Sequence, residues 1–531
     1  MGSSVARYAI VSLLVAARCA AALDSGVDAE PALAPWPVAV VAVRVPDAAA
    51  IDALAESGCV IGNVRGDTAT VYVPVRDLER LTALGYPMEI IEWQHPSVTT
   101  RPAAGAKALG QYHSYATMTA LLETYAAAYP EICRLFSAGA SYQGRELWVL
   151  RITANPDVEE DEPEFKYIST MHGDEPLGTE LCLYLIDRLL AGYGADTRIT
   201  DLVDTTAISI MPLMNPDGLE ASTRYDFLGN DMNRSFPIYG MDFTGTLYDG
   251  APLDFGGRPV EVGHVMQWTA DNSFVLSANF HTGALVVNYP YDDDGIPSGT
   301  DAPTADDLLF EEIAWRYTYH NPPMWSNDDP ANGYFNGIIN GNMWYRIQGG
   351  MQDWNYRYAS CNEVTIEVSR NKKPAESSIP DFWAENEESM LAYLESAHMG
   401  VRGLVTDSSD GAPVWAQVEV VGNSHPVFTD PDVGDYHRML LPGAYTLRYY
   451  APAYVPETVE DIVVADGPAT RADVSLINAD VDDDGAATAV DVQLIVRAVL
   501  GLPSADAPDL DGNGVSSTDI VLAIRAALQI P

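Results

Sequence analysis

Three apolar runs in the middle of the chain, each followed by polar residues, constrain the fold more than any other feature. They begin at Phe165, Ile208 and Ser273 and read FKYIST, ISIMPLM and SFVLSANF. Short apolar runs of this kind are typical of buried strands, and LGTELCLYLIDRLL after Pro176 has the length and composition of a packed helix. Because alternating strands and helices build a layered fold, we predict an α/β domain over residues 111–397.

A metal site is indicated at the ends of two of these runs. His172 and Glu175 follow the first run, and side chains three residues apart can share a face where a strand gives way to a helix. His281 ends the third run, which makes it the candidate for a third ligand. Two imidazoles and a carboxylate with an open position for water form a hydrolytic zinc site. Taken alone, however, a His-x-x-Glu pair also occurs by chance on protein surfaces.

The segments on either side of this block have their own patterns. Between Pro37 and Trp93 the order strand, helix, strand, strand, helix, strand indicates a ferredoxin-like α+β domain. Short β-rich runs alternate with turns after residue 398, as in a small β-sandwich. The chain ends in a repeat of an acidic loop and an apolar-periodic helix. The predicted boundaries are 1–22 for a signal peptide, 23–97 for the ferredoxin-like domain, 98–110 for a linker, 111–397 for the α/β domain, 398–476 for the β-sandwich and 477–531 for the repeat module.

Further segments support the metal site. They are ISIMPLMNPDGLEASTRYDFLGNDMNRSFP before His281 and NGNMWYRIQGGMQDWNYRYASCNEVTIEVS after it. Together with the metal-site segments they resemble the zinc carboxypeptidases, most closely the regulatory subfamily of carboxypeptidases E, N, M and D. The resemblance covers about residues 111–476, since GDYHRMLLPGAYTLRYYAPAYVP is similar to that subfamily's transthyretin-like domain. It implies a mixed-sheet catalytic domain, a zinc cofactor and peptide substrates with a free C-terminus.

Catalytic roles follow from the resemblance, position by position. It implies that His172, Glu175 and His281 are the zinc ligands. Glu367, in TIEVS, corresponds to the general base that takes a proton from the attacking water and passes it to the leaving amine. Arg224 corresponds to the arginine that stabilises the tetrahedral oxyanion, where a fixed cation is the expected device.

The resemblance also assigns residues to the C-terminal end of the substrate. Asn233 and Arg234 correspond to the pair that holds the terminal carboxylate, and Tyr345 to the mobile tyrosine that closes over it. Asp292 and Gln352 match the specificity pocket, where a carboxylate would select C-terminal arginine or lysine by direct ion pairing. The alternative for Asp292 is a solvated acidic turn, because three aspartates stand in a row there.

The terminal repeat resembles type I dockerins, which bind calcium and dock onto cohesins. In the first copy the predicted calcium ligands, at loop positions 1, 3, 5 and 12, are Asp480, Asp482, Asp484 and Asp491. In the second copy they are Asp509, Asp511, Asn513 and Asp519. Asp519 stands at loop position 11, so the second loop is one residue short of the pattern. The resemblance implies calcium as a cofactor and a cohesin-bearing protein as a partner.

Charge and the first residues of the chain bear on partners and location. The net charge of −46 argues against nucleic acid or an anionic membrane as a partner, because polyanions would be repelled. Arg7, an apolar run and the small residues Ala20-Ala21-Ala22 form the pattern of a signal peptide, so we expect a secreted or extracellular protein. No later run reaches about 18 apolar residues, so we expect no membrane span.

Three functions are compatible with these features. The leading one is a secreted zinc carboxypeptidase that removes a basic C-terminal residue and is tethered through its dockerin. A peptidoglycan stem-peptide carboxypeptidase is the second, because diaminopimelate offers a similar charge pattern. A catalytically inactive, cohesin-binding scaffold component is the third, although the intact ligands and base argue against it. The ferredoxin-like domain is either a prodomain, cut near Arg101 or Lys107, or a permanent accessory domain.

Overall fold

The computed structural model describes residues 37–94, 107–240, 257–482, 484–500, 510 and 516–530. The predicted signal peptide and most of the predicted linker therefore lie outside the described residues. Within the described part of the chain, no helix has both the length and the apolar character needed to cross a membrane.

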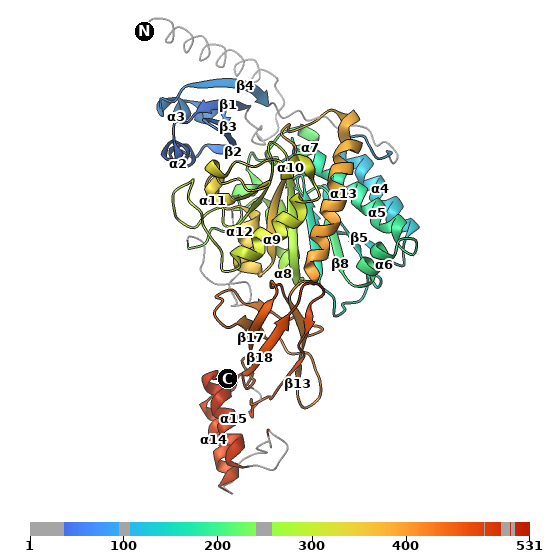
Figure 1. The fold of residues 1–531 in the computed structure, drawn as a ribbon, viewed down its shortest axis with the longest axis vertical. Helices are drawn as coiled ribbons and strands as arrows, with labels where there is room; N and C mark the ends of the chain where they lie inside the picture. Colours follow the sequence, from blue (N-terminus) through green and yellow to red (C-terminus); the bar gives the residue numbers. More distant parts are fainter. Residues whose placement is uncertain are drawn as a thin grey trace, which may run out of the picture. The chain divides into compact units, whose positions relative to one another are not determined.

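The α/β domain is built on one eight-stranded sheet, in the order β11-β10-β12-β9-β7-β8-β6-β5. Figure 1 labels β5 and β8 of this sheet. Strands β12, β9, β7 and β8 run parallel to one another, whereas β10–β12, β8–β6 and β6–β5 are antiparallel pairs. The sheet is therefore mixed. The strands are β5 (Cys133–Ala140), β6 (Glu146–Ile152), β7 (Glu164–Ser169), β8 (Ala207–Met211), β9 (Phe274–His281), β10 (Leu285–Tyr289), β11 (Ile338–Asn340) and β12 (Asn362–Val368).

The four central strands β7, β8, β9 and β12 are buried along their whole length. Helices pack on both faces of the sheet and exclude water from these strands, which explains their near-continuous apolar sequences. One face carries α4 (Tyr115–Ala128), α5 (Leu177–Gly192), α6 (Thr197–Asp204), α9 (Asp307–Thr318) and α13 (Ile379–Glu395), and the other carries α8 (Val260–Ala270) and α12 (Met351–Ala359). The connecting loops contain α7 (Pro216–Ala221), α10 (Pro322–Trp325) and α11 (Gly341–Trp344). Because the central strands are parallel, their carboxyl ends meet at one edge of the sheet.

Residues 37–94, here called the N-terminal segment, form a four-stranded antiparallel sheet in the order β2-β3-β1-β4. Its elements follow the predicted order and are β1 (Val38–Arg44), α2 (Ala48–Glu56), β2 (Val60–Arg65), β3 (Thr68–Pro74), α3 (Leu78–Ala83) and β4 (Met88–Gln94). The apolar core of this segment continues into the α/β domain through Val286, Trp344 and Tyr345. The N-terminal segment is therefore packed against the α/β domain rather than folded apart from it.

Two four-stranded sheets follow the α/β domain and share one apolar core. One sheet has the order β16-β13-β19 with β20 also paired to β13, and the other has the order β15-β14-β17-β18. The strands are β13 (Val401–Asp407), β14 (Gln417–Val420), β15 (Val427–Phe428), β16 (Asp435–Arg438), β17 (Gly443–Tyr450), β18 (Glu457–Val464), β19 (Thr470–Arg471) and β20 (Val474–Leu476). A buried ion pair of 2.7 Å between Arg438 and Asp306 joins these sheets to the α/β domain. The last helices are α14 (Ala489–Val499) and α15 (Ser517–Leu528).

Candidate active site

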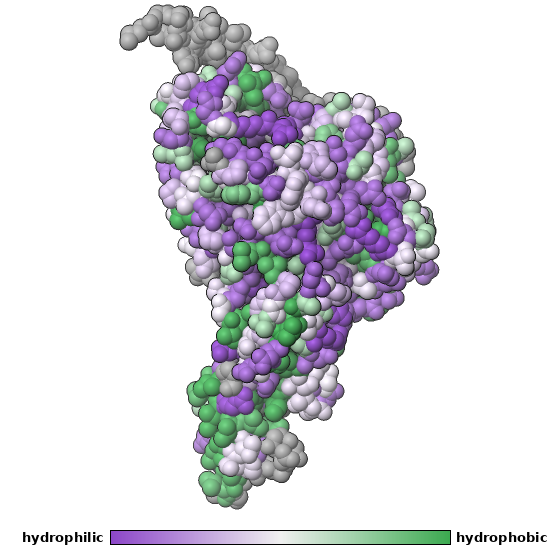
Figure 2. Space-filling view, in the orientation of Figure 1, coloured by the Kyte–Doolittle hydropathy of each residue, from purple (hydrophilic) through white to green (hydrophobic). Residues whose placement is uncertain are grey.

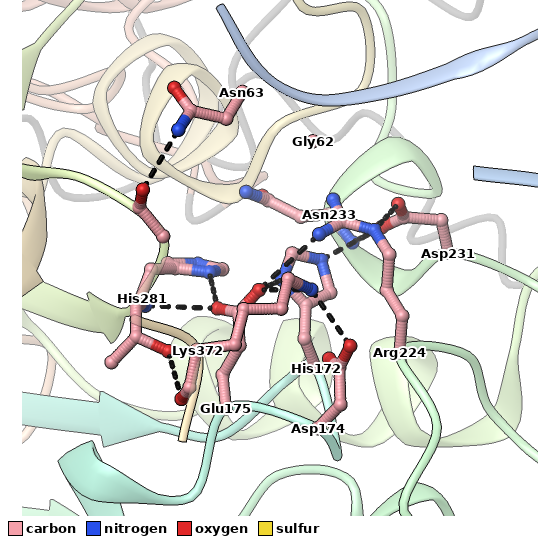
Figure 3. Close-up of polar contacts among 12 residues, drawn as sticks. Gly62, Asn63, His172, Asp174, Glu175, Arg224, Asp231, Asn233, His281 and Lys372 are labelled. Atoms are coloured by element: carbon pink, nitrogen blue, oxygen red, sulfur yellow. Dashed lines mark hydrogen bonds and ion pairs between the residues drawn. The ribbon is translucent and has the colours of Figure 1, made fainter. Parts of the chain in front are cut away.

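The three predicted zinc ligands meet at the carboxyl-end edge of the sheet (Figure 3). His172 and Glu175 lie in the loop between β7 and α5, and His281 is the last residue of β9. Since β7 and β9 are neighbours in the sheet, one ligand atom of each residue lies within 4.8 Å of the others, and all three side chains are buried. We call these three residues the zinc-ligand cluster.

Two imidazole nitrogens of this cluster are buried without a hydrogen-bond partner among the described residues. His172 Nδ1 lies 3.2 Å from Glu175 Oε1 but lacks the geometry of a hydrogen bond. His281 Nδ1 lies 2.9 Å from Glu175 Oε2, while its Nε2 is unpartnered. A buried nitrogen without a partner is costly, and a metal ion would relieve that cost. The cluster therefore fits a divalent ion.

Glu175 is surrounded by positive charge. Lys372 Nζ lies 3.1 Å and Arg224 Nη1 3.4 Å from Glu175 Oε1. Burial alone would raise the pKa of Glu175, but the charges of Lys372 and His172 outweigh it and hold the pKa well below its usual range. Glu175 is therefore a carboxylate, the form that binds metal.

Two residues of this site were not predicted. Asp231 accepts from Arg224 Nε at 2.7 Å and lies 3.1 Å from His172 Nε2, so one carboxylate orients both side chains (Figure 3). It stands two residues before Asn233 in the same polar segment, a signal that could have indicated it. Lys372 follows β12 in a loop and had no comparable signal in the sequence.

Glu367 stands next to the zinc-ligand cluster. It lies in β12, directly across from His281 in the parallel register with β9. Its Oε2 accepts from the backbone N–H of Ala284 at 3.2 Å. Burial, together with the negative charge of Glu175, raises the pKa of Glu367 to about 7. A carboxyl with such a pKa can take up and release a proton near neutral pH.

Four of the five residues predicted to hold the substrate end, Asn233, Arg234, Tyr345 and Asp292, line the same cavity as the cluster and Glu367, and Gln352 does not. Arg224, in the loop after α7, is 2% exposed and is fixed by Asp231. Asn233 and Arg234 belong to a short turn of 3₁₀ helix, in which the backbone N–H of Asn233 donates to Asp231 Oδ1 at 2.9 Å. Tyr345 follows α11 and is 3% exposed.

Asp292 is buried in the wall of this cavity, so it does not belong to a solvated turn. Glycines leave room for it: a Cβ at Gly341 would lie 2.0 Å from one carboxylate oxygen, and a Cβ at Gly350 3.0 Å from the other. Gln352 Nε2 donates to Asn288 at 2.7 Å, but its Oε1 is buried without a partner among the described residues. Burial, and then the charge of Asp353, raises the pKa of Asp292 well above its usual range. Asp292 Oδ1 accepts from Asn288 Nδ2 at 3.3 Å, whereas Gln352 Oε1 lacks a donor among the described residues.

The N-terminal segment closes this cavity. Arg234 Nη2 donates to the carbonyl of Ile61 at 2.7 Å, and the Tyr345 hydroxyl donates to the carbonyl of Gly62 at 3.4 Å. Asn63 donates to the carbonyl of Gly283 at 2.8 Å (Figure 3). The cavity that remains has a volume of about 20 Å³, room for about one water molecule. An arginine side chain cannot enter until this segment moves. The sequence offered a prodomain as one alternative for this segment, but it did not indicate these contacts.

The first acidic loop of the C-terminal repeat brings three of its four predicted ligands together. One oxygen each of Asp480, Asp482 and Asp491 lies within 4.8 Å of the others. Asp484 is not in this group, and its Oδ1 accepts from the backbone of Ala486 at 3.1 Å. In the second copy Asp519 lies in the first turn of helix α15 and accepts from the backbone of Leu510 and Ser516, each at 2.7 Å. The predicted ligands outside the described residues are Asp509, Asp511 and Asn513.

Comparison with known proteins gives matches over the same regions. The zinc carboxypeptidase family matches residues 118–389, and the carboxypeptidase regulatory-like domain matches residues 400–477. Human carboxypeptidase D is 40% identical over 389 residues, 70% of this chain and 27% of its own length, so the chain spans about a quarter of that relative. The human carboxypeptidase N catalytic chain is 37% identical over 387 residues, 68% of this chain and 84% of its own. The crystal structure of carboxypeptidase A from Helicoverpa armigera shares the fold, with a TM-score of 0.51 and 18% identity over 68% of this chain and 98% of that one.

Proposed function

Because the chain belongs to the zinc carboxypeptidase family, we propose that it is a metallocarboxypeptidase that removes the C-terminal residue of peptides and prefers arginine and lysine. The observation that carries this proposal is a single cavity lined by the zinc-ligand cluster, Glu367, Arg224 and Asp292. The groups that would carry out hydrolysis and a carboxyl group that could bind a basic side chain therefore line the same cavity.

The zinc-ligand cluster has the donors of a catalytic zinc site, two imidazoles and one carboxylate. The unpartnered nitrogens of His172 and His281 support this fit. When bound, zinc would polarise the scissile carbonyl and lower the pKa of water. Asp231 contacts His172 Nε2, the ring nitrogen on the other side from the unpartnered Nδ1. Carboxylates commonly orient metal-binding histidines through such a contact.

Glu367 supplies the proton transfers in this proposal. Its raised pKa suits a group that takes a proton from the attacking water and delivers it to the leaving amine. The backbone N–H of Ala284 fixes one oxygen of Glu367 and leaves the other for the transferred proton.

Arg224 and Arg234 would each stabilise a different negative charge, the oxyanion of the reaction and the terminal carboxylate of the substrate. Arg224 is buried beside the cluster, so its guanidinium can stabilise the oxyanion that develops on the scissile carbonyl. Arg234, with Asn233 and the hydroxyl of Tyr345, can donate to the terminal carboxylate. This requirement for a free carboxylate makes the enzyme an exopeptidase.

Basic specificity is supported by the carboxyl group of Asp292, which is buried in the wall of the cavity. A guanidinium or ammonium entering the cavity would pair with the Asp292 carboxylate and lower the pKa that burial has raised. A leucine or phenylalanine side chain would leave the Asp292 carboxyl group buried without a cationic partner, which is costly.

Chromogenic peptides ending in Arg, Lys, Leu or Phe test this function, because they differ only in the C-terminal residue whose side chain would enter the specificity pocket. The full chain, and the chain cut by trypsin between residues 95 and 110, are assayed before and after dialysis against a zinc chelator. We expect kcat/KM to be highest for Arg and Lys, to vanish on chelation and to return with zinc. A preference for Leu or Phe would overturn the basic specificity, and activity that survives complete metal removal would overturn the metal-dependent reaction.

We also propose that the N-terminal segment is an inhibitory prodomain. The carbonyls of Ile61 and Gly62 accept from Arg234 and Tyr345, the donors that a substrate carboxylate needs. Cleavage within residues 95–110 followed by removal of the segment should raise activity, and adding back the purified segment should suppress it. Equal activity with and without the segment would make it an accessory domain instead.

For the C-terminal repeat we propose calcium binding and attachment to a cohesin-bearing protein outside the cell. Three carboxylates converge in the first loop, and several large apolar side chains on α14 and α15 are exposed, including Val490, Val521 and Leu528. Figure 2 displays this surface as a hydrophobic area over the two helices. Exposed apolar patches of this kind mark protein-binding surfaces. Calorimetry with calcium tests whether the two acidic loops bind this ion. The double variant Asp480→Asn/Asp482→Asn should abolish calcium binding to the first loop. Unchanged calcium binding would contradict the assignment of these aspartates as ligands.

A further inference from the structure

A second group of acidic side chains lies between the α/β domain and the β-sandwich, away from the active site. A cavity of about 30 Å³ is lined there by Glu159, Glu162 and Glu164 from the α/β domain and by Asp430 and Asp435 from the sandwich. A space of this size holds one or two water molecules or a single ion.

The carboxylates at this cavity outnumber the cations that pair with them. With Asp161 beside the cavity there are six carboxylates, and among the described residues three arginines form ion pairs with them. These pairs are Arg151 with Glu159 at 3.0 Å and Glu164 at 3.8 Å, Arg402 with Asp161 at 3.7 Å, and Arg471 with Asp161 at 2.6 Å. Arg471 is also shared with Asp473 at 2.9 Å. Three negative charges are therefore unbalanced if every carboxyl is ionised.

Hydrogen bonds use only part of the acceptor capacity of this group. Glu162 Oε1 accepts from Thr153 at 2.8 Å, and one oxygen of Glu164 accepts from the backbone N–H of Ser273. Asp161 Oδ1 is buried without a partner among the described residues. A buried carboxylate oxygen with no donor is costly, and a bound cation would relieve that cost.

Donor atoms from both domains already converge at one point. One ligand atom each of Asp161, Asp435 and His437 lies within 4.8 Å of the others. His437 Nε2 is 2.9 Å from Asp435 Oδ2. Ser360 lines the same cavity, is 7% exposed, and its hydroxyl has no partner within the described part of the chain. This unpartnered hydroxyl indicates, independently of the carboxylates, that a ligand is missing from the cavity.

We propose that a divalent cation binds in this cavity, held by carboxylate oxygens of Asp161 and Asp435, with His437 and Ser360 as further donors. Carboxylate, hydroxyl and imidazole donors together suit Ca²⁺, Mn²⁺ or Zn²⁺. Asp161 belongs to the α/β domain and Asp435 to β16 of the sandwich, so the ion ties the two domains together.

Without an ion, protonation is the other way to relieve the excess charge. Burial, with the charge of Asp430 added, raises the pKa of Asp435 to about 8, and burial raises the pKa of Glu162 to about 7. Burial also lowers the pKa of His437 to about 3, so its imidazole is neutral and able to donate a lone pair. A bound cation replaces these protons and lets the carboxylates ionise at neutral pH.

The test counts metal ions in the full chain. The background protein carries Asp480→Asn, Asp482→Asn, Asp509→Asn and Asp511→Asn, which removes ligands of the predicted calcium loops; the active site is left intact. Asp435→Asn and Asp161→Asn are added separately, and Asp432→Asn, an exposed residue of the neighbouring turn, is the matched charge control. Each protein is dialysed to equilibrium against Ca²⁺, Mn²⁺ or Zn²⁺, its bound metal is measured by mass spectrometry, and its melting temperature is recorded with and without the ion.

We expect the background and the Asp432→Asn protein to hold one equivalent more of at least one of these ions than either cavity variant. The same ion should raise the melting temperature of the first two proteins and have less than half that effect on the variants. If Asp435→Asn fails to fold, Asp161→Asn decides, because its side chain is 23% exposed and its loss leaves the core intact. Identical metal counts and melting shifts in all folded proteins would overturn the proposal.

Discussion

The phenol ring of Tyr72 lies over the guanidinium of Arg224, with the guanidinium carbon 5.0 Å from the ring centroid. Lys372 approaches the same ring at 4.3 Å. Both cations also contact Glu175 of the zinc-ligand cluster. One aromatic side chain of the N-terminal segment thus covers the two positive charges nearest the predicted metal site.

Tyr72→Ala in the uncut chain should therefore relieve inhibition. A ring over a desolvated cation contributes about 1–2 kcal/mol, so we expect kcat/KM on an Arg-ending peptide to rise about 5- to 30-fold. Tyr72→Phe is the control, because it keeps the ring over Arg224 and should stay inhibited. An uncut Tyr72→Ala protein no more active than the parent would show that the ring does not hold the closure.

Glu367→Gln should abolish turnover without removing the metal. The amide cannot take a proton from water, and loss of a general base lowers kcat about 10²- to 10⁴-fold. Glu367 is not one of the three zinc-ligand residues, so zinc content measured on the same sample should stay near one equivalent. Turnover within tenfold of the parent, after removal of the N-terminal segment, would assign the base to another residue.

Asp292→Asn should change specificity more than catalysis. Removing the buried charge leaves an arginine substrate without its partner, so the ratio of kcat/KM for Arg over Leu should fall about 100-fold. Asp294→Asn makes the same charge change at an exposed neighbouring position and should leave the ratio unchanged. An equal response of both variants would indicate a general effect of surface charge.

Glu261→Gln should alter the pH dependence of stability. Burial raises the pKa of Glu261 from about 4.5 to about 7, although the backbone N–H of Tyr142 donates to it. The folded state therefore binds this proton more tightly than the unfolded chain, and stability falls as pH rises from about 4.5 to 7. Relative to Glu261→Gln, the parent should lose up to about 3 kcal/mol of unfolding free energy over this window, measured by denaturant titration. Glu123→Gln, a substitution on the exposed face of α4, is the control, and its unfolding free energy should change with pH as that of the parent does.

Much of the site could be predicted because local sequence encodes it. Buried strands read as apolar runs, and parallel strands present the residues that follow them at one edge, which is why His172, Glu175 and His281 were brought together as expected. The same logic covers Glu367, since it lies on a buried strand beside β9. For Asp292 the sequence left a solvated turn as an alternative, and burial removed it.

Other features depend on contacts between segments far apart in the chain, and no local pattern records them. The carbonyls of Ile61 and Gly62 carry no side-chain signal, so their hydrogen bonds to Arg234 and Tyr345 exist only because two separately encoded units pack together. The convergence of Asp161 and Asp435 is of the same kind. The sequence by itself determined the class of the fold, the order of its elements and the chemistry at the strand ends. Tertiary structure alone decided that the site is closed and that two domains share an acidic cavity, because both depend on the distances between whole domains rather than on the periodicity within one.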